Sequence, residues 1–441
     1  MPYDSPNSPQ TTGQPPAATS KVKKLGQFLR SIGLGVITGA ADDDPSAIGT
    51  YSTVGATLGP GFLWLAPAVF PMMFTVVYLS SKLGQVSGRG LFDAIRVNYP
   101  KWVLYSALGS VMIGNVIEAA ADIGGIAAGF QLLVPLPIPA IVVGATAAIV
   151  SLQFWGSYQL IKQVFQWLAL ALLAYVAAAI LAKPNLMEVI KGTFVPKLRF
   201  DEQFLSLAVA VIGTSLSAYL YTWQSNEEVE EEIAMGRVTV RQRRGATDEE
   251  LQHSRRNILF GMTFSNVIMY FIMLSTSATL YKAGIHEISS AADAAKALRP
   301  LAGNTAGLLF AIGIVAVGFL AVPVMTTGAA YDLAQTMGWK SSLNARPGEA
   351  RKFYAAIAVF SALAMSMNFI GVNPMKALVW AGIVQGFSAP ALLFLILQMT
   401  NSRRIMGARK NGLAINVLGA ITSLLILTAT IALIITWVTK R

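Results

Sequence analysis

The chain has no cysteine, few charged residues and only two histidines in 441 residues. The absence of cysteine excludes disulfides, thiolate metal sites and a cysteine nucleophile. His253 and His286 both lie in polar stretches, which excludes a histidine proton relay within a membrane. Charged residues make up 12% of the chain and hydrophobic residues 54%, whereas soluble domains carry about 25% charged residues. The composition predicts an all-α polytopic membrane protein.

Apolar stretches of membrane-spanning length recur along the whole chain. They predict eleven transmembrane helices, near residues 31–57, 61–83, 102–131, 138–156, 159–182, 204–226, 257–282, 305–336, 353–371, 376–399 and 413–438. Most of the 33 Lys and Arg fall in the N-terminal tail and in alternate loops. By the positive-inside rule this predicts a cytoplasmic N-terminus and an extracellular C-terminus. The same bias explains the net charge of +11, so no nucleic-acid partner is expected.

The spans divide the chain into five expected parts. They are a disordered cytoplasmic tail (1–28), a first repeat (29–182), an extracellular loop (183–203), a second repeat (204–400) and a last helix with the C-terminus (401–441). We expect no cleavable signal in the tail, because a long polar stretch precedes the first apolar helix. Within the second repeat, residues 227–256 carry a run of glutamates followed by arginines. We expect this segment to be a solvated cytoplasmic loop without a catalytic role.

Three carboxylates interrupt the first apolar segment, at Asp42, Asp43 and Asp44, and Pro45 follows them. An ionised carboxylate in hydrocarbon costs at least a few kcal/mol, so these side chains need water, a cation or a protein partner. Pro45 removes a backbone donor and moves the residue before it out of the helical region. Free carbonyls and carboxylates at such a helix break favour a hard cation. The alternative, a loop between two buried helices of a soluble protein, disagrees with the composition.

A second interruption is expected in the sixth segment, where Gly213, Thr214, Ser215 and Ser217 lie near the centre. Glycine is a poor helix former, and hydroxyls compete for backbone hydrogen bonds. A polar helix-packing patch is the alternative interpretation. Breaks in the first and sixth segments are the pattern of a five-plus-five inverted repeat with a peripheral eleventh helix. The substrate would then lie between the two breaks.

Several short motifs in this order resemble the NRAMP family of divalent-metal transporters, and more narrowly its NRAMP-related magnesium transporter (NRMT) branch. The family's DPGN motif falls on Asp44–Ala47 and its MPH motif on Ser217–Tyr219. Further matches are Ile212-Gly213, Leu220-Tyr221, Ser81–Gly84 with Gly88, Asn401–Gly407, and a helix-ten glutamine at Gln385. The resemblance covers most of the chain. It implies a LeuT-like fold of the APC superfamily, with eleven helices.

This sequence departs from the family motifs at four positions. Ala47 replaces the asparagine ligand, Ser217 replaces the methionine, and Tyr219 and Gln224 replace two histidines. A thioether favours softer transition metals, so its loss leaves a site for hard cations. Magnesium tends to retain waters, which suits a roomy site with few direct ligands. The resemblance therefore implies Mg²⁺ as the transported substrate, with Mn²⁺ as a second one and no cofactor.

The resemblance also implies a ligand set. Asp44 would be the main ligand, joined by the backbone carbonyls of Ala41 and Thr214, and by Ser217 and Gln385. Asp43 is extra relative to the family and would be a ligand, a vestibule group or the partner of a basic residue. Glu118 and Asp122 lie one turn apart and share a helix face. They would carry protons, line an aqueous path or satisfy hydrogen bonds between helices.

Other functions remain open. The first is a proton-coupled transition-metal symporter, although the family histidines are absent here. The second is an amino-acid or amine symporter, with Tyr219, Tyr221 and Trp223 against an organic substrate. The carboxylates beside the first break argue against it. A membrane hydrolase would need a motif such as HExxH or GxSxG, and neither occurs, so no enzyme is expected. We expect a multi-pass protein of a bacterial-type inner membrane without an obligatory protein partner.

Overall fold

The computed structural model describes residues 34–155, 172–299 and 303–439. Within these ranges every regular element is a helix or a helical turn, and no strand occurs. The predicted tail over 1–28 lies outside the described residues, and so does much of the fifth predicted span. The all-α prediction is confirmed over the described part of the chain.

Eight helical stretches of the described chain are long and apolar enough to cross a membrane. They are α4 (Leu65–Ser87), α6 (Lys101–Gln131), α7 (Ile138–Trp155), α11 with α12 (Glu202–Ser215 and Ala218–Ala234), α14 (Asp248–Thr276, continued by a π-turn over Ser277–Tyr281), α17 (Ala306–Met337), α19 (Pro374–Asn401) and α21 (Leu413–Thr439). The three other predicted spans coincide with shorter helices: α2 (Leu34–Asp42) with α3 (Pro45–Leu58), α9 (Leu173–Leu181), and α18 (Arg351–Met367).

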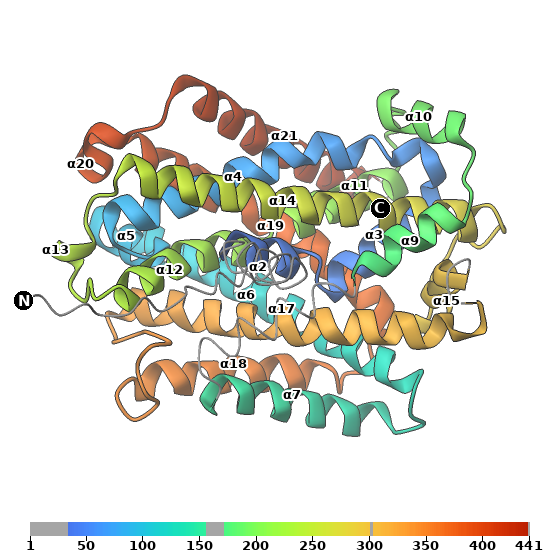
Figure 1. The fold of residues 1–441 in the computed structure, drawn as a ribbon, viewed down its shortest axis with the longest axis horizontal. Coiled ribbons are helices and arrows are strands. Elements are labelled where there is room, and N and C mark those ends of the chain that lie inside the picture. The colour runs from blue at the N-terminus through green and yellow to red at the C-terminus, as the bar shows by residue number, and fades with distance from the viewer. Residues whose placement is uncertain (1–33, 156–171, 300–302, 440–441) are drawn as a thin grey trace, which may run out of the picture. The chain divides into compact units, whose positions relative to one another are not determined.

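The remaining helices are short and connect the long ones. They are α5 (Leu91–Asn98), α10 (Leu186–Phe194), α13 (Val240–Arg243), α15 (Ala291–Ala295) and α20 (Arg403–Met406). In Figure 1, α10 and α15 lie at one end of the long helices, and α5, α13 and α20 lie at the other. We call these the α10 end and the α13 end. The ribbon of α14 crosses the middle, α2 packs against both α14 and α17, and α18 and α7 form the outer layer next to α17.

Glycines bring the two interrupted helices close to their neighbours. A Cβ added at Gly39 of α2 would collide with the Gly261 carbonyl of α14, and one added at Gly213 of α11 would collide with the Gly382 carbonyl of α19. Backbones can approach this closely only where the side chain is a hydrogen. Each interrupted helix is therefore placed by a direct backbone contact with a continuous helix.

The structure differs from the prediction of a solvated loop over 227–256. Helix α12 continues to Ala234, and α14 begins at Asp248. Four glutamates of this run are buried, with exposed fractions of 8% or less: Glu227, Glu228, Glu230 and Glu232. The prediction that they form a solvated surface is wrong, because a sequence does not show which acids will find hydroxyl and amide donors when a helix is buried.

Two of these glutamates illustrate that point. Glu228 Oε1 accepts hydrogen bonds from the Ser81 and Ser254 hydroxyls, both at 2.7 Å, and from Gln224 Nε2 at 2.8 Å. Glu230 accepts from the Tyr331 hydroxyl at 2.7 Å, and its other oxygen accepts from Ser342 and Asn344. Such bonds offset the cost of removing a carboxylate from water.

Candidate functional site

The first break separates α2, which ends at Asp42, from α3, which begins at Pro45. Asp44 is the N-cap of α3, with an extended backbone (φ −64°, ψ 175°). Its Oδ1 accepts a hydrogen bond from the Ala47 amide at 2.7 Å. Proline is favoured at the first helical position, where its missing N–H removes no bond. The Asp-Pro pair thus stops one helix and starts the next, as the sequence predicts.

The second break has the same length. Helix α11 ends at Ser215, and α12 begins at Ala218, with Ser217 as its N-cap (φ −57°, ψ 136°). The Ser217 side chain makes no capping bond to the start of α12. Its hydroxyl instead lies 3.0 Å from Glu118 Oε1 and 3.0 Å from the Thr214 carbonyl, both of which are acceptors. The predicted unwinding in the sixth segment is therefore present, without a proline.

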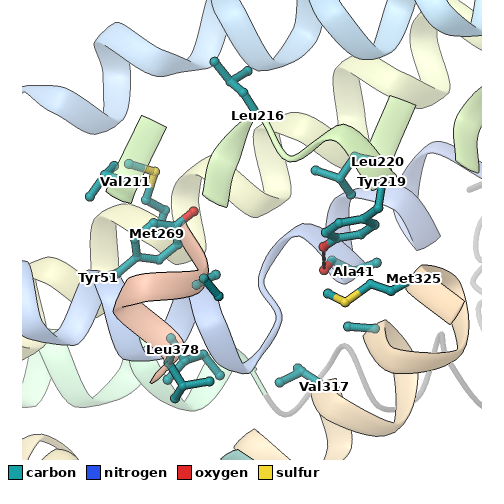
Figure 2. Close-up of a cluster of buried hydrophobic side chains, with 14 of the residues drawn as sticks. Ala41, Tyr51, Val211, Leu216, Tyr219, Leu220, Met269, Val317, Met325 and Leu378 are labelled. Atoms are coloured by element: carbon teal, nitrogen blue, oxygen red, sulfur yellow. Dashed lines mark hydrogen bonds between the residues drawn. The ribbon is translucent and has the colours of Figure 1, made fainter. Parts of the chain in front are cut away.

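Tyr219 joins the two breaks. Its hydroxyl donates to the Ala41 carbonyl at 2.7 Å and lies 3.0 Å from Asp44 Oδ2. Figure 2 shows the Tyr219 ring reaching from α12 to Ala41 beside the interruption of the first helix. The phenol thus occupies two oxygens that the sequence nominates as metal ligands. On the other side of the breaks, the hydroxyls of Tyr51 and Ser215 are 2.8 Å apart.

Helix α6 supplies one carboxylate to each break. Asp122 Oδ1 accepts from the Ser46 amide at 2.9 Å and from the Ser46 hydroxyl at 3.1 Å, at the start of α3. Glu118 accepts from the Ser217 hydroxyl at the second break. The structure therefore brings both acids, one turn apart on one face, to the interrupted helices. In this arrangement both act as hydrogen-bond acceptors between helices.

Gln385 of α19 completes the second break. Its Nε2 donates to Glu118 Oε2 at 2.6 Å, and its Oε1 accepts from the Ala218 amide at 3.4 Å. The amide oxygen therefore satisfies a free N–H at the start of α12, where Ser217 gives no cap. The sequence did not single out Asn115, whose Oδ1 lies 3.4 Å from Gln385 Nε2. A lone asparagine in an apolar helix carries no signal that would place it here.

Asp42 and Asp43 lie against Ser265 of α14. The Ser265 hydroxyl donates to Asp42 Oδ2 at 2.6 Å and lies 3.4 Å from Asp43 Oδ1. The other oxygens, Asp42 Oδ1 and Asp43 Oδ2, have no hydrogen-bond partner among the described residues. Of the three roles considered for Asp43, pairing with a basic residue receives no support from the ion pairs of the described chain. No pattern in the sequence singles out Ser265.

Gln224 lies further along α12, towards the α13 end. Its Oε1 accepts from the Thr38 hydroxyl of α2 at 2.6 Å, and its Nε2 donates to Glu228. Gln224 therefore ties α2 to α12 beyond the breaks. Neither of these hydrogen bonds joins it to Asp44, and its place beside the ion pathway stays a prediction.

Every residue nominated as a site residue from the sequence is fully buried, with an exposed fraction of 0%. They are Ala41, Asp43, Asp44, Ala47, Glu118, Asp122, Thr214, Ser217, Tyr219, Gln224 and Gln385. No group of three or more His, Asp or Glu side chains within the described residues is placed to hold a metal ion. The polar atoms nearest the two breaks are the Asp44 carboxylate and the backbone carbonyls of Ala41 and Thr214, and oxygens of these kinds are ligands of hard cations.

Two interrupted helices that meet inside a bundle of membrane-length helices define the class of secondary membrane transporters. The comparisons with known proteins agree. Residues 35–436 match the Nramp family model, described as natural resistance-associated macrophage protein-like. The chain belongs to the Nramp family; it is a multi-pass membrane transporter and not an enzyme.

Curated relatives align over nearly the whole chain. The sequence is 25% identical to the divalent metal cation transporter MntH of Deinococcus radiodurans over 438 residues, which cover 97% of this chain and 95% of that protein. It is 26% identical over 439 residues to the MntH of Bacillus subtilis, covering 97% of each chain.

Solved structures show the LeuT-like fold. A manganese transporter of Eremococcus coleocola aligns with a TM-score of 0.67 at 19% identity, over 97% of this chain and 89% of that one. The nucleobase-cation-symport-1 family transporter Mhp1 aligns with a TM-score of 0.58 at 14% identity, over 92% of this chain and 90% of that one. The fold prediction is confirmed.

Proposed function

We propose that this Nramp-family divalent-metal transporter carries Mg²⁺, with Mn²⁺ as a second substrate, across a bacterial-type inner membrane. The ion would bind at Asp44 and be reached from one side of the membrane at a time. The observation that carries the proposal is the chemistry of the two helix breaks. Position 47 presents a methyl group and position 217 a hydroxyl, which is bonded to Glu118. Neither of these two positions therefore supplies a soft ligand, and the oxygens of Ala41, Asp44 and Thr214 suit a hard, partly hydrated cation.

The transport is driven by membrane potential and needs no obligatory proton symport. Moving one elementary charge across 100 mV is worth about 2.3 kcal/mol, so a divalent cation entering the cell gains about twice that. Tyr219 and Gln224 stand where the family pattern has histidines, and both act as hydrogen-bonding groups here. The bias of Lys and Arg supports a cytoplasmic N-terminus, which makes the α13 end cytoplasmic.

A second candidate is proton-coupled transport of a transition metal such as Mn²⁺. Two observations favour it. Glu118 and Asp122 are buried acids beside the breaks. Figure 2 also draws Met325 of α17, whose thioether would be a soft ligand in this candidate, in the same buried cluster as Ala41 and Tyr219.

Uptake into proteoliposomes tests both candidates. Mg²⁺ and Mn²⁺ entry would be recorded together with internal pH under an imposed potential, for the wild type and for Asp44→Ala and Met325→Leu. The Mg²⁺ proposal expects potential-driven Mg²⁺ entry without acidification, loss of entry in Asp44→Ala and unchanged entry in Met325→Leu. Acidification that tracks metal entry would establish the coupled mechanism instead. Normal transport by Asp44→Ala would refute the site.

A further inference from the structure

Asp332 of α17 is a buried carboxylate that the two breaks do not use. Its exposed fraction is 0%, and neither of its oxygens accepts a hydrogen bond from any described residue. None of the ion pairs found in the described chain includes it. Burying an ionised carboxylate without partners costs several kcal/mol. Unsatisfied buried groups of this kind are uncommon in folded proteins and call for a physical reason.

Asp332 lies on a polar seam between α12 and α17. On α12 the seam is formed by side chains four residues apart, which share a helix face. Three contacts define the seam: a Cβ added at Gly328 would lie 3.8 Å from Thr222 Oγ1, Gln335 Nε2 donates to Asn226 Oδ1 at 2.6 Å, and the Tyr331 hydroxyl donates to Glu230 Oε1 at 2.7 Å. The seam runs from the second break towards the α13 end.

Asp332 faces Thr222, at the end of the seam nearest the breaks. The Thr222 hydroxyl lies beside the Asp332 carboxylate, but it donates to the Tyr219 carbonyl of its own helix at 3.1 Å. The hydroxyl has one proton to donate, so its oxygen lone pairs and at least one carboxylate oxygen of Asp332 are available to a ligand. Thr222 follows Tyr219 by about one helical turn, so Asp332 lies one turn beyond the phenol that bridges the breaks.

Glu230, the other carboxylate of the seam, has a structural role. Glu230 is 1% exposed, and its side chain accepts hydrogen bonds from Tyr331, Ser342 and Asn344. Its burial is explained by these donors. Asp332 is as deeply buried, and among the described residues only the Thr222 hydroxyl is near enough to donate to it, so at least one of its oxygens is free for a cation.

We propose that Asp332, together with the Thr222 hydroxyl, is a second station for the transported divalent cation, occupied after the ion leaves Asp44 on its way to the α13 end. The proposal rests on the proposed function of the Asp44 site. Carboxylate and hydroxyl oxygens are hard ligands that bind a partly hydrated divalent ion. An ion that binds tightly at one site leaves that site slowly. A second carboxylate on the route lowers the electrostatic barrier for the ion to leave Asp44.

Transport kinetics give the first test. In proteoliposomes, Asp332→Asn is expected to lower the maximal rate of Mn²⁺ uptake at least about tenfold, while the Mn²⁺ affinity of the purified protein stays within about twofold of the wild type. Asp332→Glu should restore most of the rate. Glu230→Gln is the matched control, since it changes a buried acid of the same seam and should keep its rate. A wild-type rate for Asp332→Asn, or an equal loss for Glu230→Gln, would overturn the proposal.

Direct binding gives the second test. Free Mn²⁺ would be followed by electron paramagnetic resonance during titration of Asp44→Asn and of the double variant Asp44→Asn with Asp332→Asn. The proposal expects weak residual binding in the first protein and none in the second; equal binding by both would overturn it. Normal transport by Asp44→Asn would instead refute the proposed function, so the two failures are distinguishable. Thermal melting would confirm that all variants fold.

Discussion

The two helix breaks have the same length and opposite chemistry. At the first, residues of the break itself interrupt the helix. Pro45 lacks the backbone N–H, and the Asp44 carboxylate caps α3 by accepting from the Ala47 amide. At the second, no proline and no side-chain cap are present. There the start of α12 is satisfied from outside, by Gln385 of α19, and Ser217 turns to Glu118 of α6. The first break is a property of its own sequence, whereas the second depends on its neighbours.

The difference suggests separate roles for the two breaks: the first binds the ion, and the second holds the surrounding helices in place. The first break offers a carboxylate that also faces the other break through Tyr219. The second contributes only carbonyl and hydroxyl oxygens, held by a network of amide and carboxylate groups. We therefore expect substitutions at the first break to abolish ion binding, and substitutions around the second to alter selectivity, stability or rate.

The largest expected effect on transport comes from substituting the two N-cap residues, Asp44 of α3 and Ser217 of α12. Asp44→Ala should reduce Mg²⁺ uptake by more than about 100-fold, because it removes the carboxylate that meets Tyr219 of the second interrupted helix. Ser217→Ala should reduce uptake by about threefold, since one hydroxyl to a charged acceptor is lost. Uptake into proteoliposomes at saturating and limiting Mg²⁺ would measure both. Equal losses for the two variants would break the comparison.

Glu118 tests the dependence of the second break on its neighbours. In the wild type, the Ser217 hydroxyl and the Gln385 amide both donate to the Glu118 carboxylate. In Glu118→Gln these two donors face an amide that carries no charge and accepts through one oxygen only. We expect a loss of about 2 kcal/mol of stability, the value of a hydrogen bond to a charged group, and a lower thermal midpoint. Asp122→Asn is the counterpart at the first break. If it destabilised the protein more than Glu118→Gln, the first break would not be self-sufficient.

Selectivity should respond to substitutions that restore soft ligands. The double variant Ala47→Asn with Ser217→Met should raise the preference for Mn²⁺ over Mg²⁺ by about tenfold, because a thioether favours transition metals. Competition between the two ions for uptake would measure it. Each single variant serves as a control for the other. An unchanged ratio would show that residues outside the breaks decide the selectivity.

Tyr219→Phe should strengthen ion binding. The phenol competes with the ion for the Ala41 carbonyl and Asp44 Oδ2. Removing one net hydrogen bond of about 1 kcal/mol predicts an apparent affinity about fivefold higher. Equilibrium titration with Mn²⁺ would measure it, with Tyr51→Phe as the control at the Ser215 contact. Weaker binding in Tyr219→Phe would mean that the phenol itself is a ligand.

The smallest effect concerns the far end of α11, where Asp201 caps the helix through the Phe204 amide at 3.0 Å. This bond holds the pKa of Asp201 below its usual range. The stability it contributes is therefore present above the ordinary pKa and is lost as the pH falls through the lowered one. Asp201→Ala should cost about 1 kcal/mol or less at neutral pH and nothing in strong acid. Thermal midpoints across pH would show whether the difference disappears.

The sequence sufficed for the features that local chemistry dictates. Asp44-Pro45 predicts its own break, and the spacing of Glu118 and Asp122 predicts that they share a face. Ser265, Asn115 and the burial of Glu228 could not be predicted, because each depends on a partner far away along the chain. The glutamate run looked like a solvated loop for the same reason: the hydroxyls of Ser81 and Ser254 that satisfy Glu228 are supplied by other helices.

The length of α12 has a mechanical consequence. It runs without interruption over 17 residues from the second break to Ala234, which makes a rod about 25 Å long. A tilt of about 10° at Ser217 would move the far tip by about 4 Å, more than the length of a hydrogen bond. Among the residues of α12, those next to Ala234 would therefore move farthest when the helix tilts. A ligand that binds at this end of α12 would prevent the helix from tilting and so inhibit transport without contacting the ion.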